Sequence, residues 1–218
     1  MKTIYIILII VAVIISIYGI IYLSTKYAAN VEIKRLNRIK KIDEKIRYPI
    51  LEDLLKFASE KAEENNIKLI PSFGTLLGLV REKEIIRHDY DIDLFLYEED
   101  WFKFKKIMKE NNRYKYKEIN HLWHHKYGIY DEKTELGIDF ERIYNSNKEI
   151  KLDVFLSFTG SGVRDGEIIW KEAFRKKFKK DIFEPLEKKD TKYGSLYFPN
   201  KSEELMEIWY GKDWRTPR

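Results

Sequence analysis

The stretch DIDLFLY, residues 91–97, determines how the rest of this sequence is interpreted. Apolar and aromatic side chains at almost every position predict a strand that is buried on both faces. Asp91 and Asp93 stand at its beginning. Because residues two apart on a strand point to the same face, both carboxylates are expected to enter one cleft. Two neighbouring carboxylates repel each other, and a cation between them keeps both ionised. The stretch therefore predicts a cation site at the start of this strand.

A third carboxylate completes this site in our interpretation. Asp153 lies within KLDVFL, residues 151–156, a predicted strand that is otherwise mostly apolar. Burying a lone carboxylate there is costly without a partner or an ion. The alternative is that Asp153 faces outward at a strand edge, or pairs with Lys151 or Arg142. The chain has no cysteine, so a metal must be held by oxygen or imidazole, and an oxygen-only set favours Mg²⁺ or Mn²⁺.

Upstream of the acid pair, Gly74-Thr75 follows a predicted strand, residues 68–73, and precedes a short apolar helix. By itself such a pair is only a turn. Between a strand and a helix, however, it offers backbone N–H groups and a hydroxyl to phosphate oxygens at a helix N-terminus. The pair is therefore a candidate phosphate-binding turn.

Periodicity around these motifs predicts a mixed α/β domain, with strands of both directions flanked by helices. Further helices are expected over residues 50–64, 98–111 and 202–210, and further strands over 136–144, 150–158 and 194–198. The turn Asn145-Ser146-Asn147 predicts that the strands on either side of it pair antiparallel. Pro49 marks the expected entry to the domain, because proline disfavours helix in the residue before it. No element is predicted between Asn111 and Leu136.

The chain contains four short motifs: GTLLG at residues 74–78, Arg81, HDYDID at residues 88–93, and an ending YGKDW at residues 210–214 followed by Pro217. Together they resemble the signature of the LicD/fukutin-related family, within the nucleotidyltransferase-fold superfamily. The resemblance covers residues 50–218. His88 stands where the family has tryptophan, which removes no ligand. The stretch between Asn111 and Leu136 matches nothing in the family, so the acceptor site is not assigned.

The resemblance implies a nucleotidyltransferase-like mixed sheet flanked by helices, and a metal-dependent phosphotransferase. The implied reaction moves a phosphocholine-like group, an alditol phosphate or a sugar phosphate from a CDP-type nucleotide donor to a glycan hydroxyl. Asp91 and Asp93 would hold Mg²⁺ or Mn²⁺ on the donor's diphosphate. Asp153 would complete the metal site or accept the proton of the attacking hydroxyl.

Four residues are expected to bind the substrate: Gly74, Thr75, Arg81 and Asp89. Arg81 would clamp a phosphate oxygen, unless it forms a surface ion pair with Glu82 or Glu84. Asp89 would orient the loop or contact a second metal.

A membrane anchor is expected at the N-terminus. Residues 4–23 are uncharged and rich in Ile, Leu and Val, and a helix of this length spans ~30 Å, the thickness of a bilayer's hydrocarbon core. The alternative, a cleaved signal peptide, has a shorter apolar region and more charge before it. The expected organisation is a transmembrane anchor (1–23), a basic juxtamembrane stalk (24–48) and a catalytic domain (49–218).

The charge distribution bears on orientation and on partners. Residues 24–48 carry eight bases against three acids, Lys2 is the only charged residue before them, and the remainder of the +5 chain has a net charge of −1. The positive-inside rule then places the catalytic domain in the cytoplasm, and a Golgi or ER lumenal orientation is the alternative. A nearly neutral body argues against nucleic acid as a partner.

Other functions remain open at this point. A D-x-D glycosyltransferase using a nucleotide sugar explains the anchor and the acid pair, but does not require Gly74-Thr75 or Asp153. A catalytically inactive, membrane-tethered binding module and a transferase of nucleotides are further alternatives. His121, His124 and His125 resemble half a metal site, and the aromatic tail (Trp209, Tyr210, Trp214) either stacks on a base or sugar or seals the core.

Overall fold

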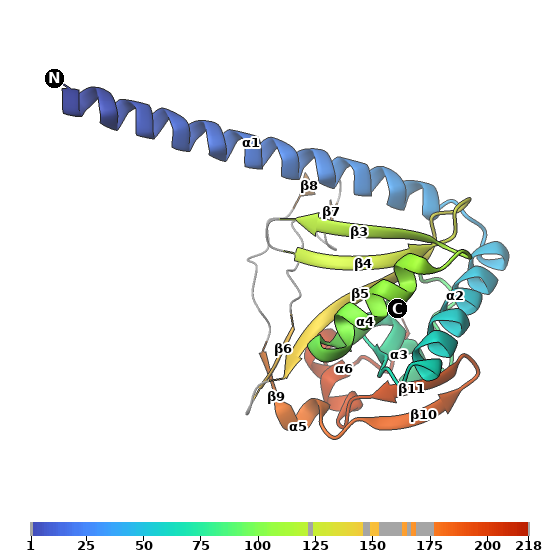
Figure 1. The fold of residues 1–218 in the computed structure, drawn as a ribbon. Helices are drawn as coiled ribbons and strands as arrows, with labels where there is room; N and C mark the ends of the chain where they lie inside the picture. Colours follow the sequence, from blue (N-terminus) through green and yellow to red (C-terminus); the bar gives the residue numbers. More distant parts are fainter. Residues whose placement is uncertain are drawn as a thin grey trace. The chain divides into compact units, whose positions relative to one another are not determined.

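The computed structural model describes residues 2–121, 124–145, 149–152, 163–164, 167–168 and 177–217 (Figure 1). The chain divides into two compact units. One consists of Met1–Arg38 and Leu156–Ala173, and the other of Ile39–Phe155 and Phe174–Arg218.

The first unit contains α1 (Lys2–Ile39) and a short hairpin of β7 (Val163–Arg164) and β8 (Glu167–Ile168). Within α1, Ile4–Ser24 is long and apolar enough to cross a membrane, and none of it is buried. A signal sequence passes the same test of length and composition. The helix runs on through most of the basic segment that was expected to form a stalk.

The second unit begins with α2 (Glu44–Glu64), whose first turn is capped by the carboxylate of Asp43. The helix passes through Pro49, so the expectation that helix starts only after this proline was wrong. Tertiary contacts explain the difference. Arg47 and Tyr48 are both buried, and each donates a hydrogen bond to an oxygen outside the helix, which holds the turn before the proline in helical form.

A mixed sheet forms the centre of the second unit, with the strand order β1-β2-β5-β4-β3. These strands are β1 (Ile70–Pro71), β2 (Asp91–Tyr97), β5 (Gly137–Asn145), β4 (His124–Tyr130) and β3 (Lys115–His121). β2 and β5 are parallel, and the other neighbours on this path are antiparallel. Beyond the end of β4, β6 (Glu149–Leu152) pairs with β5, and β9 (Lys177–Lys179) pairs with β6. The predicted mixed sheet flanked by helices is confirmed.

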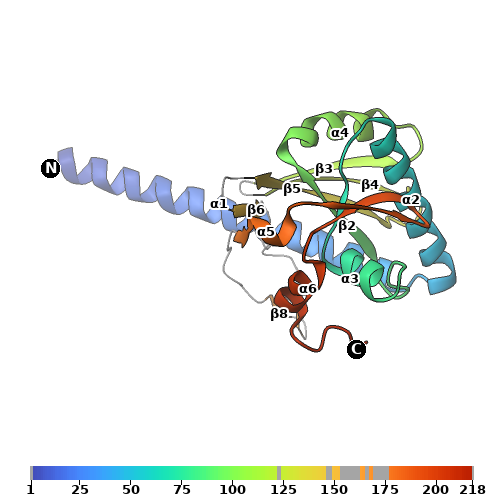
Figure 2. The same cartoon turned by 90° about the horizontal axis from the view of Figure 1, so that it is seen from below.

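Helices cover both faces of this sheet (Figure 2). α4 (Glu98–Glu110) lies on one side, and α3 (Phe73–Arg81) and α6 (Ser202–Tyr210) lie on the other. Phe104 of α4 packs on Phe140 with ring centroids 5.2 Å apart. On the opposite face, Phe95 contacts Phe73 and Trp209 at 5.5 and 6.3 Å. Since Phe95 shares its face of β2 with the two aspartates, the acids face the side of α3 and α6.

Most expected elements are present, and the described residues add several that were not expected. α3, α4, α6, β2 and β11 (Gly194–Phe198) agree with the expectations within a few residues. β5 and β6 pair antiparallel as predicted. The additional elements are the β3–β4 hairpin, the β7–β8 hairpin, β9, α5 (Lys180–Phe183) and β10 (Glu187–Thr191). Only Tyr116 and Ile119 of β3 are apolar or aromatic, and all but one residue of β10 are exposed, so neither strand has the apolar pattern on which the prediction relied.

Candidate active site

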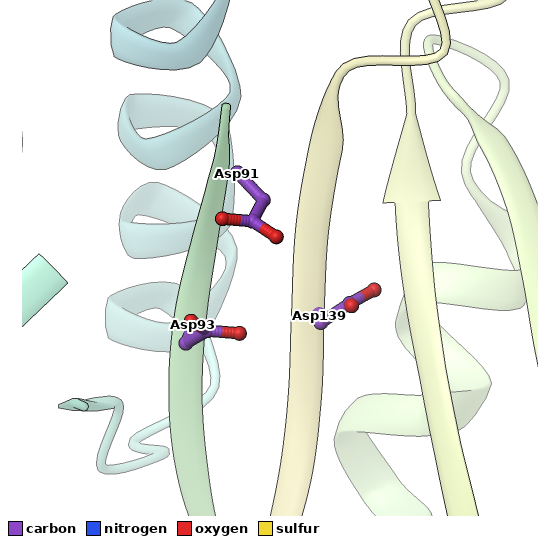
Figure 3. Close-up of side chains that lie close together, drawn as sticks. All are labelled: Asp91, Asp93 and Asp139. Carbon is purple, nitrogen blue, oxygen red and sulfur yellow. The ribbon is translucent and has the colours of Figure 1, made fainter. Parts of the chain in front are cut away.

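Three carboxylates meet between β2 and β5 (Figure 3). Ligand oxygens of Asp91, Asp93 and Asp139 all lie within 4.8 Å of one another. Parallel pairing of the two strands sets Asp93 directly beside Asp139. Asp91 reaches the same space because it lies two residues before Asp93. The acid cluster, as we call these three residues, therefore depends on the register of two strands that are distant in sequence.

Asp139 is the most enclosed member of the acid cluster, with 6% of its surface exposed. Lys126 of β4 forms an ion pair with it, with Nζ 2.5 Å from Oδ2. The hydroxyl of Tyr130, on the same strand, donates a hydrogen bond to Oδ1. Gly128 of β4 pairs with Asp139 of β5. Lys126 and Tyr130 lie two residues before and after Gly128, so their side chains are on the same face of the sheet as Asp139.

The acid cluster is electrostatically strained without a cation. Burial raises the pKa of Asp93 well above its usual range, and repulsion from Asp91, Glu141 and Asp139 raises it further. Burial alone would lower the pKa of Lys126, but attraction to Asp139 and Glu141 outweighs it and raises that pKa. Glu141 itself is buried, two residues beyond Asp139 on β5. Negative charge thus exceeds what Lys126 offsets.

This donor set fits a hard divalent cation. Its ligands are carboxylate oxygens, which Mg²⁺ and Mn²⁺ prefer. Two oxygens bound to one Mg²⁺ lie about 3 Å apart in neighbouring positions and about 4.2 Å apart in opposite ones, so the three carboxylates, whose oxygens lie within 4.8 Å of one another, would draw closer together around such an ion. A cation there would also relieve the repulsion that raises the pKa of Asp93.

The Gly74-Thr75 turn lies beside the acid cluster. The hydroxyl oxygen of Thr75 accepts the backbone N–H of Asp93 at 3.0 Å, which fixes the start of α3 to β2. Asp89 packs over Gly74, since a methyl group there would lie 2.5 Å from its Oδ2. Burial raises the pKa of this carboxyl. Ser72 precedes α3, but its side chain does not cap the helix. The backbone N–H groups of the first turn therefore donate no hydrogen bond to the Ser72 hydroxyl.

The expected phosphate clamp, Arg81, is occupied by protein partners. Its Nη2 lies 2.5 Å from Glu82 Oε1, and its Nη1 donates to the carbonyl oxygen of Trp214 at 3.3 Å. The structure thus has the ion pair that the sequence allowed as the alternative. Arg81 still lines a pocket of about 180 Å³ together with His88, Tyr210 and Trp214. Burial and the nearby charges of Asp93 and Asp89 raise the pKa of Tyr210, which places this pocket next to the acids.

Two other parts of the sequence interpretation have different outcomes. Asp153 lies outside the described residues, so its role as a metal ligand stays a prediction. His121 and His124 pair across the tip of the β3–β4 hairpin. Gly128 faces the acid cluster and lies four residues along β4 from His124, which is about 13 Å. The histidine backbone is therefore at the far end of that strand from the acids. The side chains of these histidines are not among those described.

Sequence reasoning did not assign Asp139, Glu141, Lys126 or Tyr130 to the site. A signal for the two acids was present, because Asp139 and Glu141 repeat the two-residue spacing of Asp91 and Asp93 within a strand. For Lys126 and Tyr130 the sequence offers no comparable signal, since the hairpin that carries them was not predicted.

Comparisons with known proteins identify the family of this chain. Residues 66–201 match the family described as LicD/FKTN/FKRP, nucleotidyltransferase domain. The uncharacterized protein RP689 of Rickettsia prowazekii (strain Madrid E) is 30% identical over 106 residues, or 49% of this chain. The match spans only 32% of that relative's length. The crystal structure of ANT(2")-Ia in complex with adenylyl-2"-tobramycin is similar with a TM-score of 0.33 and 21% identity, over 44% of this chain and 49% of its own.

Proposed function

Because this chain belongs to the LicD/FKTN/FKRP family of nucleotidyltransferase domains, we propose that it is a metal-dependent transferase acting on glycans. It takes a phosphoryl-linked group from a CDP-type nucleotide and transfers it to a glycan hydroxyl. The group is phosphocholine-like, an alditol phosphate or a sugar phosphate. The observation that carries the proposal is the convergence of Asp91, Asp93 and Asp139 within 4.8 Å.

Each residue of the site has a task in this reaction. Asp91, Asp93 and Asp139 hold the divalent cation, which when bound neutralises charge that develops on the leaving nucleotide. Thr75 keeps the start of α3 against β2 through its hydrogen bond with the amide of Asp93, so the uncapped N–H groups of α3 are positioned for phosphate oxygens. Asp153 keeps its predicted role, as a further ligand or as the base that accepts the proton of the acceptor hydroxyl.

Substrate contacts outside the acid cluster come from the turn and from the adjoining pocket. Gly74 leaves the room at the first turn of α3 that the carboxylate of Asp89 occupies, and Asp89 orients this loop. Arg81 binds a phosphate oxygen once it exchanges Glu82 for the donor.

A donor screen tests this function directly. CDP-choline, CDP-ethanolamine, CDP-ribitol, CDP-glycerol and GDP-mannose are each added to the full-length chain in detergent, with Mg²⁺ or with EDTA, and the melting temperature is measured. We expect stabilisation by one CDP compound only when Mg²⁺ is present. Stabilisation by GDP-mannose alone would favour a glycosyltransferase, and no response to any donor would favour a binding module.

The role of the acid pair is tested with Asp91→Asn. This change keeps the shape of the side chain but removes one metal-binding charge, so we expect turnover to fall by about 10²–10³-fold with the fold intact, as for other losses of transition-state charge stabilisation. Circular dichroism checks the fold, and release of CMP in the presence of an acceptor measures the activity. Activity retained in this variant would contradict the assignment.

We also propose that α1 anchors the chain in a membrane, with residues 49–218 as the catalytic domain on the cytoplasmic side. The chain contains no cysteine, so a single Cys introduced at Lys106, whose side chain is 75% exposed, reports on sidedness. A membrane-impermeant maleimide should label this variant only after the cells are opened. Labelling of intact cells would place the domain outside the cytoplasm.

A further inference from the structure

Both carboxylate oxygens of Asp139 already have a partner. Lys126 Nζ lies 2.5 Å from Oδ2, and the Tyr130 hydroxyl donates to Oδ1. The side chain of Asp139 is only 8% exposed and that of Lys126 24% exposed, so water screens their attraction poorly. An ammonium group therefore holds the same carboxylate that a divalent cation requires.

The space around Tyr130 indicates that this arrangement is built into the strands. A methyl group at Gly137 would lie 2.1 Å from Cδ1 of the Tyr130 ring, and one at Gly128 would lie 2.6 Å from its hydroxyl oxygen. Neither position can carry a side chain unless the ring moves. Because neither glycine has a side chain, the Tyr130 ring has room to reach Asp139. Its hydroxyl group then fixes the orientation of the Asp139 carboxylate.

Lys126 also acts on more than its direct partner. Its charge is attracted to Glu141 and Asp93 as well as to Asp139, and it lowers the pKa of Asp93, which burial and the other acids raise. Without a metal, Lys126 is thus a positive charge that keeps these acids together. With a metal, the two cations stand close to the same carboxylate and repel each other.

We propose that Lys126 is a resident counter-ion that competes with the divalent cation for Asp139. It keeps the acid cluster compact in the metal-free protein, and it lowers the affinity of the site for the cation. This inference rests on the proposed metal site. Lys126 is a positioning residue in this scheme, and Tyr130 holds the shared carboxylate in place for either cation.

Calorimetric titration with Mg²⁺ or Mn²⁺ tests the competition in the full-length chain in detergent. Lys126→Met removes the competing charge, and Lys105→Met is the matched control, because Lys105 pairs with Glu118 and not with the acid cluster. We expect the Kd for the cation to fall at least ~10-fold in K126M, since coupling between close charge pairs is commonly of that size or larger. The metal-free melting temperature should fall in K126M, and K105M should change neither quantity appreciably.

A second variant keeps the test decisive if K126M does not fold without metal. Lys126→Gln retains a hydrogen-bond donor towards Asp139 but not the charge, and it should also bind the cation more tightly than the wild type. Equal or weaker cation binding in the Lys126 variants overturns the inference and leaves the proposed function standing. Absence of cation binding in the wild type and in every variant overturns the proposed function itself.

Discussion

Replacing Asp93 by asparagine should make the metal-free protein more stable while it removes metal binding. Two unit charges 4.8 Å apart, the largest separation among these ligand oxygens, repel by about 3.5 kcal/mol at an effective dielectric constant of about 20. Asp93 faces Asp91 and Asp139 at this distance or less, so repulsion costs about 7 kcal/mol or more if all three are ionised. Two effects make the stabilisation by Asp93→Asn smaller than this repulsion energy. The variant loses the attraction of Lys126, and the raised pKa of Asp93 means that a proton already relieves part of the repulsion.

We therefore expect Asp93→Asn to raise the unfolding free energy of the metal-free protein by about 2–3 kcal/mol, or its melting temperature by about 5–10 °C. Thermal melts of the full-length chain in detergent, with EDTA and with Mg²⁺, measure the effect. In EDTA the variant should be the more stable protein, whereas Mg²⁺ should stabilise only the wild type. Asp53→Asn is the control, because Asp53 forms an exposed ion pair with Arg113, and its loss should cost at most about 1 kcal/mol. An Asp93 variant that melts below the wild type in EDTA, or that still responds to Mg²⁺, would refute the reasoning.

Two further predictions concern the stability of the fold. Gly137→Ala forces a methyl group to 2.1 Å from the Tyr130 ring, so it should lower the unfolding free energy by about 1–3 kcal/mol, and an unchanged melting temperature would contradict this. Hydrogen bonds from Lys192 and Tyr48 lower the pKa of Glu84, so their stabilisation is present above the ordinary pKa of glutamate and is lost as the pH falls through the lowered value. Glu84→Gln should therefore be less stable than the wild type at pH 7 in denaturant melts, and the difference should shrink below about pH 4. A difference that does not depend on pH would argue against this linkage.

The sequence was sufficient for those parts of the site that local pattern determines. Asp91 and Asp93 share a face because they belong to one strand, and Gly74-Thr75 lies at a strand–helix turn because its neighbours have those propensities. The third acid is a different problem. Asp153 was chosen because its strand is apolar, whereas the acid that stands beside Asp93 among the described residues is Asp139. Choosing between acids on two predicted strands requires knowledge of which strand pairs with β2, and that depends on packing of the whole sheet.

Register is the physical condition on which the acid cluster depends. β2 and β5 run parallel with Asp93 opposite Asp139, and the next matched pair, Leu94 and Phe140, points to the side of α4. A slip of one residue in β5 would turn Asp139 towards the aromatic layer under α4 and bring Phe140 to the acids, which burial energies forbid. The same apolar contacts that stabilise the sheet therefore hold mutually repelling carboxylates within 4.8 Å. A bound cation would relieve the repulsion that packing now opposes, and that is why we interpret the acid cluster as a metal site and not as a surface patch.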